Sequence, residues 1–247
     1  MLPANKDQAL HKTIMIRVLL KILDDTFLSQ NMFFKGGTCA SMLGYLDRFS
    51  VDLDFDIKSK ELGAKISKHL EEAFSVLDLE IKDYSKNVVQ YYLKYEAPDG
   101  SRNTLKIDAV EVPHKNNNYE NMLLPEINRY ATCQTKETLF TNKLVALVDR
   151  FDQHNAIAGR DLYDIHYFLK SGFDINEALI VERRGVNLKI YLKQLIDFIE
   201  KHITQTVINQ DLNFLLDYKK FNTIRQTLKE ETIILLKDRL VQGPSSN

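Results

Sequence analysis

The stretch from Lys35 to Ile57, KGGTCASMLGYLDRFSVDLDFDI, constrains the fold more than any other part of the chain. Its last residues carry an acid at every second position. Successive side chains of a strand point to opposite faces, so Asp52, Asp54 and Asp56 share one face and the apolar residues between them share the other. The alternation predicts a strand with one face in a core and one face that can bind a cation.

A divalent metal ion explains why carboxylates would be placed so close together. Side chains two residues apart on a strand are about 6 to 7 Å apart, and like charges at that distance repel each other. Mg²⁺ takes hard oxygen ligands, usually one or two carboxylates together with substrate phosphates and water. Asp52 and Asp54 are therefore the first candidates for metal ligands and catalytic residues.

The glycine turn before this strand predicts a site for an anion. Gly36 and Gly37 can adopt backbone angles closed to other residues and let a ligand approach the main chain. Thr38 can cap the helical run that follows, whose first N–H groups would point at a phosphate. Most such turns simply begin helices, so this signal is weak by itself. Combined with the acidic strand, it favours a nucleoside triphosphate as the ligand.

The pattern Lys-Gly-Gly-Thr, a short helical run, then Arg-x-Ser-x-Asp-Leu-Asp-Phe resembles the AbiEii-type nucleotidyltransferases. This branch of the DNA polymerase β-like superfamily includes toxins of type IV toxin–antitoxin systems and the MenT toxins. Residues 143–150 (KLVALVDR) and 160–164 (RDLYD) resemble the family's lysine-containing helix and its Arg-Asp-x-x-Asp motif. The residues that match the first pattern are Lys35, Gly36, Gly37, Thr38, Arg48, Ser50, Asp52, Leu53, Asp54 and Phe55.

The resemblance implies an α/β (α+β) fold. A polymerase β-like nucleotidyltransferase domain with a mixed sheet is expected at residues 1–125, followed by a C-terminal helical bundle at 126–247. The implied activity is transfer of a nucleoside monophosphate from an NTP to an acceptor, with two Mg²⁺ ions as cofactor. The acceptor would be RNA, in particular the 3′ end of a tRNA, and a cognate antitoxin would be a partner. The nucleotide would be bound by Lys35, Gly36, Gly37, Thr38, Arg48 and Ser50.

A third metal ligand is expected on a neighbouring strand. Alternation in residues 103–112 puts Lys106 and Asp108 on one face, and Asp108 is a single acid in a mostly apolar segment. A buried carboxylate normally has a partner. By resemblance Asp108 is the third metal ligand, and pairing with a lysine or an arginine is the alternative. Segments rich in Val, Ile and Tyr predict strands at 77–84, 88–96 and 103–112, with a hairpin turn at 98–100.

The chain after residue 135 carries almost no strand signal and holds the second part of the expected site. By resemblance Lys143 contacts the phosphates, where its ammonium would stabilise the departing pyrophosphate. Asp161 opens the matched motif and would orient Lys143 or help to position the acceptor. A solvated lysine and an aspartate favoured by a helix N-terminus are the structural alternatives. Helices are expected at 138–151, 160–170, 175–184, 188–203, 212–218 and 222–241.

The charge and composition of the chain bear on where the protein is located in the cell and on which partners it can bind. The formal net charge of −1 argues against an electrostatic grip on nucleic acid by the whole protein, but it permits a local basic groove. The apolar run IMIRVLLKIL is interrupted by Arg17 and Lys21, which predicts an amphipathic packing helix, no membrane association and a cytoplasmic protein. Cys39 and Cys133 are expected to be free thiols. A basic path for RNA would use Arg183, Arg184, Lys189, Lys193, Lys219 and Lys220.

Two alternatives to RNA modification remain open at this point. The same catalytic apparatus could modify a protein or a small molecule, as an aminoglycoside nucleotidyltransferase does. The fold could also serve as a non-catalytic module that binds nucleotide. Intact Asp52, Asp54 and the Gly-Gly-Thr turn argue against a module without activity.

Overall fold

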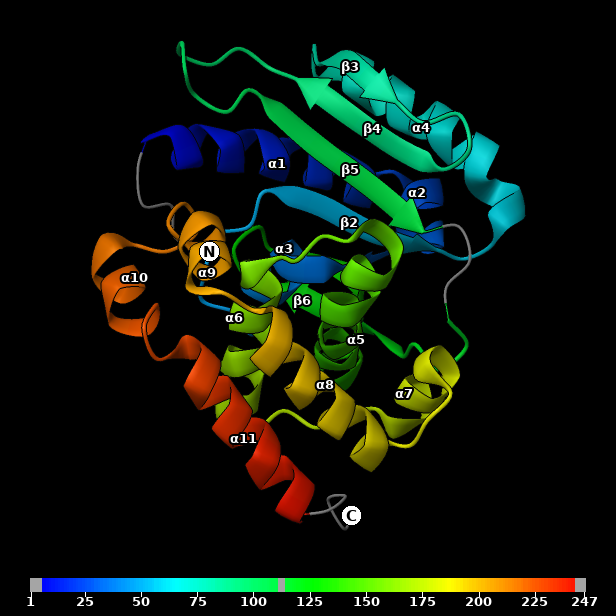
Figure 1. Ribbon diagram of the computed structural model, residues 1–247. Helices are drawn as coiled ribbons and strands as arrows, with labels where there is room; N and C mark the ends of the chain where they lie inside the picture. The colour runs from blue at the N-terminus through cyan, green and yellow to red at the C-terminus, as the bar shows by residue number, and fades with distance from the viewer. Residues whose placement is uncertain (1–5, 111–113, 243–247) are drawn as a thin grey trace. The chain divides into compact units, whose positions relative to one another are not determined.

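The computed structural model describes residues 6–110 and 114–242. The chain divides into two compact units, which are seen in Figure 1. The sheet unit comprises residues 1–113 and 118–135, and the helical unit comprises residues 114–117 and 136–247. No helix within the described ranges is long and apolar enough to cross a membrane.

The sheet unit is built on one mixed sheet, whose strands lie in the order β3-β4-β5-β2-β1-β7-β6. The central strand β2 pairs antiparallel with β1 and parallel with β5, and β1 pairs parallel with β7. The other neighbours pair antiparallel. The strands are β1 (Met32–Lys35), β2 (Asp52–Ile57), β3 (Glu80–Tyr84), β4 (Val89–Lys94), β5 (Thr104–Val110), β6 (Tyr119–Leu124) and β7 (Arg129–Gln134).

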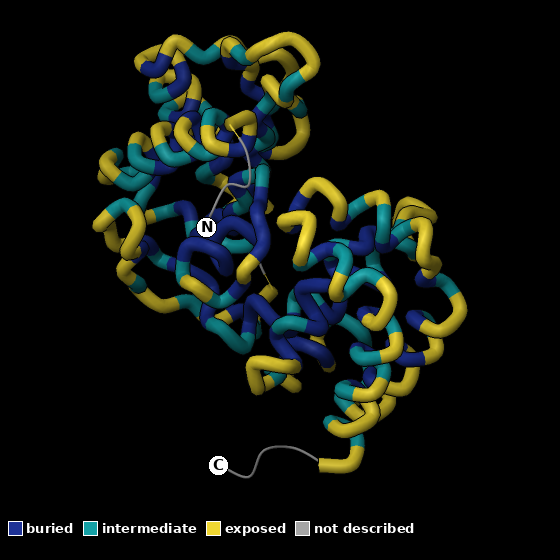
Figure 2. The backbone as a smooth tube through the Cα atoms, turned by 90° about the vertical axis from the view of Figure 1, so that its left-hand side faces the viewer, coloured by how far each residue is buried: buried dark blue, intermediate teal, exposed yellow. Residues whose placement is uncertain are grey.

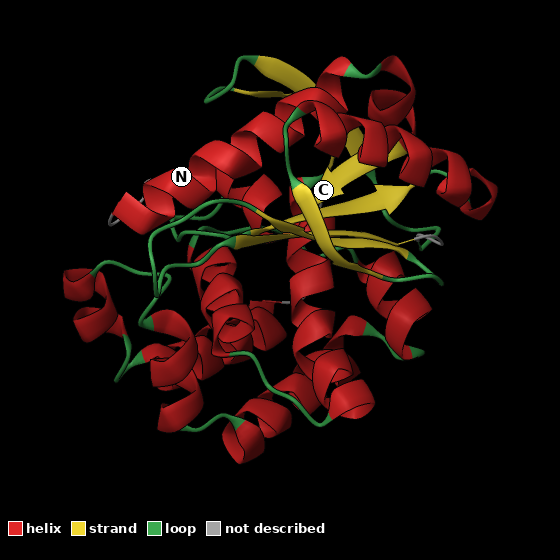
Figure 3. Cartoon of the chain, turned by 90° about the horizontal axis from the view of Figure 1, so that it is seen from above, coloured by secondary structure: helices red, strands yellow, loops and turns green. Residues whose placement is uncertain are grey.

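Helices of the same unit cover the apolar side of the sheet. The long helix α1 contacts β2, β5 and β7, while α4 contacts β3 and β4 (Figure 3). The alternate residues Leu53, Phe55 and Ile57 of β2 are at most 1% exposed, as the alternation predicts. Cys39 and Cys133 are free and buried, also as predicted. The helices are α1 (Lys6–Asp24), α2 (Thr26–Asn31), α3 (Gly36–Met42) and α4 (Gly63–Val76), with a 3₁₀ turn at Lys60–Leu62.

The helical unit packs around α6, which contacts α5, α9 and α11. Its core includes an edge-to-face pair between Phe140 and Phe168, with ring centroids 5.6 Å apart, and Tyr191, whose hydroxyl donates to the Leu144 carbonyl at 2.7 Å. Figure 2 shows the buried backbone inside each unit and exposed turns outside. The helices are α5 (Lys136–His154), α6 (Gly159–Lys170), α7 (Glu177–Arg184), α8 (Leu188–His202), α9 (Gln205–Leu212), α10 (Tyr218–Ile224) and α11 (Leu228–Gln242).

The sequence analysis was wrong about several segments. The helix expected at 222–241 is interrupted at 225–227, between the end of α10 at Ile224 and the start of α11 at Leu228. Residues 212–218 were expected to form a helix, but 213–217 connect α9, which ends at Leu212, to α10, which begins at Tyr218. The reason is a pair of N-caps: Thr204 accepts from the Val207 N–H, and Asp217 accepts from the Lys220 N–H, so helices begin after both residues. The strands β6 and β7 were not expected at all.

The two missed strands lack the local signals of a strand. Most residues of β6, an edge strand, are exposed or half-buried, and β7 (RYATCQ) has no clean apolar alternation. Their place is set by long-range pairing instead: β7 lies beside β1, with Cys133 opposite Phe34. The predicted hairpin of β4 and β5 has the expected strong alternation and is confirmed.

Asp56 joins the acidic strand to the two missed strands. It is 1% exposed, and its Oδ1 accepts from the Lys35 ammonium at 2.7 Å. Its Oδ2 accepts from the Tyr119 hydroxyl at 2.6 Å and from the Gln134 amide at 2.7 Å. One carboxylate thus connects β2 to β1, β6 and β7. The third acid of the alternating series is a structural group.

Replacement of this carboxylate should destabilise the sheet unit strongly. Asp56→Ala leaves a lysine and a buried amide without their acceptor, and we expect the free energy of unfolding to fall by about 3 kcal/mol. The measurement is urea unfolding followed by circular dichroism.

Asp52→Ala on the same strand is the matched control. Among the described residues the Asp52 carboxylate makes no hydrogen bond or ion pair, so its loss should change the unfolding free energy by less than about 0.5 kcal/mol. Equal losses in the two variants would contradict this account of Asp56.

Candidate active site

The acidic face of the sheet brings together the carboxylates that the sequence analysis singled out. Asp52 and Asp54 of β2 are half-buried, and Leu53 between them is fully buried in the core. In the parallel pair of β2 and β5, Asp54 lies opposite Asp108 and Asp52 lies opposite Lys106. Residues directly opposite in paired strands share a face. Three acids and one lysine therefore occupy adjacent positions on one face.

Gly36 is the point where the glycine turn meets this face. Its φ is +77°, a conformation that side chains with a Cβ rarely adopt. A Cβ built on Gly36 would lie 2.4 Å from Oδ2 of Asp54, closer than any real contact. Both the backbone angle and the space therefore require glycine. The Asp54 carboxylate lies directly against the main chain of the turn.

Gly37 likewise has no space for a Cβ, because two side chains that precede β2 pack against it. A Cβ there would lie 2.8 Å from Nη2 of Arg48 and 2.9 Å from Oγ of Ser50. Both side chains are buried, and Nη1 of Arg48 donates to the Phe49 carbonyl at 2.9 Å. Because β2 begins at Asp52, Ser50 lies just before the strand. The structure thus groups Arg48 and Ser50 at the glycine turn.

Thr38 does not cap the helix, contrary to the sequence analysis. The helix α3 already begins at Gly36, with Lys35 in the N-cap position. Thr38 is fully buried, and its hydroxyl donates to the Asp52 carbonyl at 2.5 Å. The side chain therefore holds α3 against the first residue of β2.

His11 of α1 holds the adjacent peptide and was missed by the sequence analysis. It is 1% exposed, and its Nε2 donates to the Val51 carbonyl at 2.8 Å. Its Nδ1 lies 2.7 Å from the Tyr95 hydroxyl. Burial lowers the pKa of His11, so the ring is neutral at pH 7. A single histidine on the buried side of an amphipathic helix gives no signal of such a role in the sequence.

Asp108 has a cation as its partner, which is the second of the two roles that the sequence left open. The Lys106 ammonium lies 2.6 Å from its Oδ2, and each side chain is about one-third exposed or less. Burial alone would lower the pKa of Lys106, but the hydrogen bond and the charge of Asp108 outweigh burial and raise it. Lys106 therefore stays charged. Its place on the acidic face followed from the alternation, but no role was predicted for it.

In the helical unit, Lys143 is held by both acids of the Arg-Asp-x-x-Asp segment. Its ammonium lies 3.1 Å from Oδ1 of Asp161 and 3.0 Å from Oδ2 of Asp164. Arg150 pairs with the other oxygen of Asp161 at 3.3 Å. Both carboxylates are at most 1% exposed, whereas the Lys143 side chain is 19% exposed. The lysine is thus a positioned group rather than a solvated one.

The charges around Asp161 determine its ionisation. Burial would raise its pKa, but Lys143, Arg150 and Arg160 lower it to about 2. The carboxylate is therefore ionised at any physiological pH. It also serves as the common partner of Lys143 and Arg150, which occupy one face of α5.

The basic residues proposed for an RNA path differ in their surroundings. Arg183 and Arg184 both pair with Asp149 at 2.6 Å, and Arg184 also contacts Asp152. These two arginines are thus part of a mixed, internally paired surface. Lys220 lies over the rings of Tyr163 and Tyr167, with its ammonium 5.7 and 6.0 Å from their centroids.

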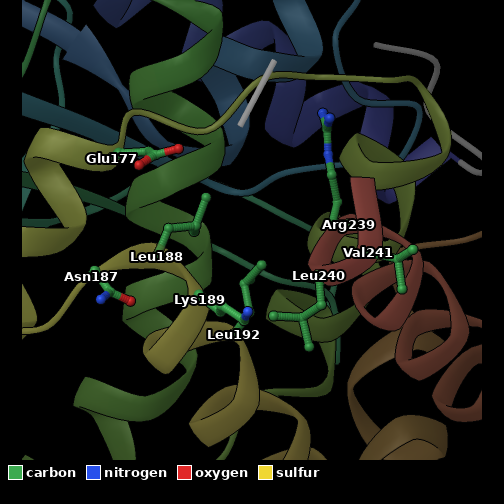
Figure 4. Close-up of a pocket in the computed structure, with 8 residues that line it drawn as sticks. All are labelled: Glu177, Asn187, Leu188, Lys189, Leu192, Arg239, Leu240 and Val241. Carbon is green, nitrogen blue, oxygen red and sulfur yellow. The ribbon is translucent and has the colours of Figure 1, made fainter. Parts of the chain in front are cut away.

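A cavity of about 370 Å³ in the helical unit lies apart from the motif residues. It is formed by residues of α7, α8 and α11 and by the turn before α8. In Figure 4 the Glu177 side chain and the Arg239 side chain stand on opposite sides of it. None of the residues matched to the nucleotidyltransferase motifs lines this cavity. The lining consists of Glu177, Asn187, Leu188, Lys189, Leu192, Arg239, Leu240 and Val241.

Comparison with known proteins identifies the family. The sequence model of the family described as "Nucleotidyl transferase AbiEii toxin, Type IV TA system" matches residues 17–231. The chain belongs to the AbiEii family. It is therefore a nucleotidyltransferase, and the family implies an NTP substrate and an antitoxin partner. The motif matches at Lys35–Phe55 and 143–164 lie inside the matched range.

Solved structures support the AbiEii fold. A Helicobacter pylori protein, provisionally assigned as a nucleotidyltransferase, is 22% identical with a TM-score of 0.59, and the alignment covers 94% of each chain. The nucleotidyltransferase toxin MenT4 of Mycobacterium tuberculosis is 16% identical with a TM-score of 0.55, over 94% of this chain and 85% of MenT4. No curated protein sequence matches the chain.

The acidic face of this AbiEii protein suits a divalent ion at two of its residues. Asp52 has a half-buried carboxylate with no protein partner among the described residues, and the Asp54 carboxylate is fixed against Gly36. Hard oxygen donors of this kind fit Mg²⁺. Across residues 6–110 and 114–242, no three of the His, Cys, Asp and Glu side chains are grouped so that they could hold a metal ion.

The pH dependence of the unfolding free energy should reveal the contribution of the ion pairs between Asp161 and the cations Lys143 and Arg150. The folded pKa of about 2 lies below the ordinary value of about 4, so the stabilisation is complete above pH 4 and is lost as the pH falls through 2. We expect Asp161→Asn to cost about 2 kcal/mol of unfolding free energy at pH 7. Its stability should also change less than that of the wild type between pH 4 and pH 2, measured by urea unfolding at each pH.

Asp152→Asn is the control for this titration. Asp152 pairs with Arg184 at the surface, where its side chain is 53% exposed, and such pairs contribute little. Its unfolding curves should follow those of the wild type. An Asp161→Asn variant with unchanged acid sensitivity would show that Asp161 does not carry this stability.

Proposed function

We propose that the chain transfers a nucleoside monophosphate from an NTP to RNA, in particular to the 3′ end of a tRNA, as the toxin of a type IV toxin–antitoxin system. The acidic face next to the glycine turn is the observation that carries this proposal. The donor is held by Lys35, Gly36, Gly37, Arg48 and Ser50, and Mg²⁺ by Asp52 and Asp54, while the buried Thr38 acts by holding α3 against β2. Asp108 as a third ligand and a second ion remain predictions of the sequence analysis.

Each step of the proposed reaction is assigned to residues whose contacts are described above. When bound, Mg²⁺ neutralises phosphate charge and lowers the pKa of the attacking hydroxyl. Asp52 and Asp54 orient their carboxylates outward from a strand that His11 and Thr38 hold in place. In the helical unit, Lys143 is the proposed catalytic cation, because its ammonium is ordered by two carboxylates, is partly exposed and can stabilise negative charge on phosphate oxygens.

Aromatic and basic side chains near α10 support an RNA acceptor over a small molecule. Tyr218 is 81% exposed and Phe214 is 43% exposed, and Lys219 lies next to Tyr218. Exposed rings beside lysines suit unpaired nucleotides, because bases stack on aromatic side chains while the lysines contact phosphates.

Transfer of labelled nucleotide tests the proposal directly. Purified protein is incubated with Mg²⁺, each α-³²P-labelled ribonucleotide in turn, total RNA and cell-extract protein, and the products are separated on gels. We expect label in a tRNA-sized band with the wild type and a loss of at least about 100-fold with Asp52→Ala. Asp52→Ala should remain folded, because it relieves repulsion within the acidic face.

Other outcomes of the same experiment have definite meanings. Label on protein would replace the RNA acceptor with a protein acceptor. Full activity of Asp52→Ala would show that the proposed metal assignment is wrong. Silence in every lane, together with no nucleotide binding, would favour a module without catalysis.

The contact between Gly36 and Asp54 gives a second test with a matched control. Gly36 and Gly44 have nearly equal φ values of +77° and +76°, but a Cβ on Gly44 would meet nothing within 4 Å. Both alanine variants should therefore lose about 1 kcal/mol from backbone strain. Only Gly36→Ala should also displace the Asp54 carboxylate, so we expect its transfer rate to fall at least tenfold more than that of Gly44→Ala. Equal rates would show that the contact has no catalytic importance.

A further inference from the structure

The helix α6 carries the acids that hold Lys143, but it begins without a cap from its own segment. Its N-cap residue is Ala158, whose side chain cannot accept a hydrogen bond. Ser, Thr, Asp or Asn normally fills this position, because the first N–H groups of a helix need acceptors. Asp161 lies in the first turn, but its two carboxylate oxygens accept from Lys143 and Arg150. Residues 158–161 thus supply no side-chain cap for α6.

The cap comes from α9 of the same unit instead. Oδ2 of Asp211 accepts from the N–H of Gly159, the first residue of α6, at 2.6 Å. The carboxylate is half-buried, and the two residues are 52 positions apart in the sequence. A carboxylate at this place also interacts favourably with the positive end of the helix dipole. Asp211 therefore does for α6 what the N-cap residue of a helix normally does.

The backbone of α9 fixes where this carboxylate lies. A Cβ on Gly159 would lie 2.8 Å from the Val207 carbonyl oxygen and 3.2 Å from Cα of Ile208, so α9 approaches the start of α6 as closely as a glycine permits. Ile208 and Leu212 of α9 are buried in the helical unit. The start of α6 is therefore held by close packing of two backbones and by one charged hydrogen bond.

We infer that Asp211 is a positioning residue for the transfer reaction: it holds the first turn of α6, so that the Asp161 carboxylate stays directed at the Lys143 ammonium. An acid in the first turn can otherwise reach back to cap its own helix, as in a capping box. The cap from α9 makes that bond unnecessary and leaves both oxygens of Asp161 to the cations of α5. This inference rests on the proposed catalytic role of Lys143.

The ordering of the Lys143 ammonium tests this inference without any measurement of transfer. The full chain is labelled with ¹⁵N-lysine, and NMR at low temperature detects those ammonium groups that acceptors protect from exchange with water. Lys143→Arg identifies the Lys143 signal by its absence. We expect this signal in the wild type and its loss in Asp211→Ala. Asp211→Asn should restore it, because an amide oxygen can accept the same hydrogen bond.

Asn187→Ala is the matched control for the loss of a cap. Asn187 caps α8 in the same unit, where its side chain accepts from the Ile190 N–H at 3.0 Å. Both alanine variants should remain folded by circular dichroism and should unfold at a lower urea concentration, because each lacks one side-chain cap. Only Asp211→Ala should lose the Lys143 signal. A signal that is lost in both variants, or in neither, would overturn the role of Asp211.

Transfer kinetics separate this inference from the proposed function. We expect Asp211→Ala to lower kcat about tenfold and to change the KM for NTP less than about twofold, because the charge that Lys143 stabilises develops in the transition state. Asp211→Asn should recover most of kcat, and Asn187→Ala should keep the wild-type value.

Two combinations of results have opposite meanings. Transfer by the wild type, with an unchanged kcat and Lys143 signal in Asp211→Ala, would leave the function in place and overturn the inference. A Lys143 signal lost only in Asp211→Ala, without transfer to any acceptor by the wild type, would confirm that Asp211 positions Lys143 and would overturn the proposed function.

Discussion

The absence of a side chain at Gly36 is the constraint on which the rest of the site depends. Oδ2 of Asp54 takes up the space that a Cβ would need, so the glycine turn and the acidic strand can be adjacent only with glycine at this position. Gly37 repeats the arrangement with Arg48 and Ser50. The glycine turn is therefore in direct contact with the acidic strand and the residues that precede it. This contact explains why the sequence motif requires glycines at these two positions.

The same strand is fixed at its beginning through its backbone. The Val51 carbonyl accepts from His11, and the Asp52 carbonyl accepts from Thr38. These donors come from α1 and α3, both of which pack on β2. With its backbone held from two sides, the strand can present charged side chains without moving to relieve their repulsion. Preorganisation of this kind is what electrostatic catalysis requires.

The sequence predicted the structure correctly where the pattern involves only neighbouring residues. Alternation located β2 and β5 and put Asp108 on the same face as Lys106, because the period of a strand is visible in a few residues. That Asp108 lies beside Asp54 was expected only from the family resemblance, and the pairing of β2 with β5 places it there. It could not distinguish Asp56 from its two neighbours, because the partners Tyr119 and Gln134 lie 63 and 78 positions away. Those partners belong to β6 and β7, the two strands that were not predicted. The structural role of Asp56 was therefore missed because the strands were missed. The role of His11 depends equally on a contact between distant parts of the chain.

Lys143 shows how buried carboxylates can order a cation before any ligand binds. A lysine in water loses side-chain entropy when it binds, whereas Lys143 is already ordered by Asp161 and Asp164. The two buried carboxylates also compete with any incoming anion for the ammonium. An anion that binds this ammonium must therefore displace or share two buried carboxylates, since the charge of Lys143 is already balanced.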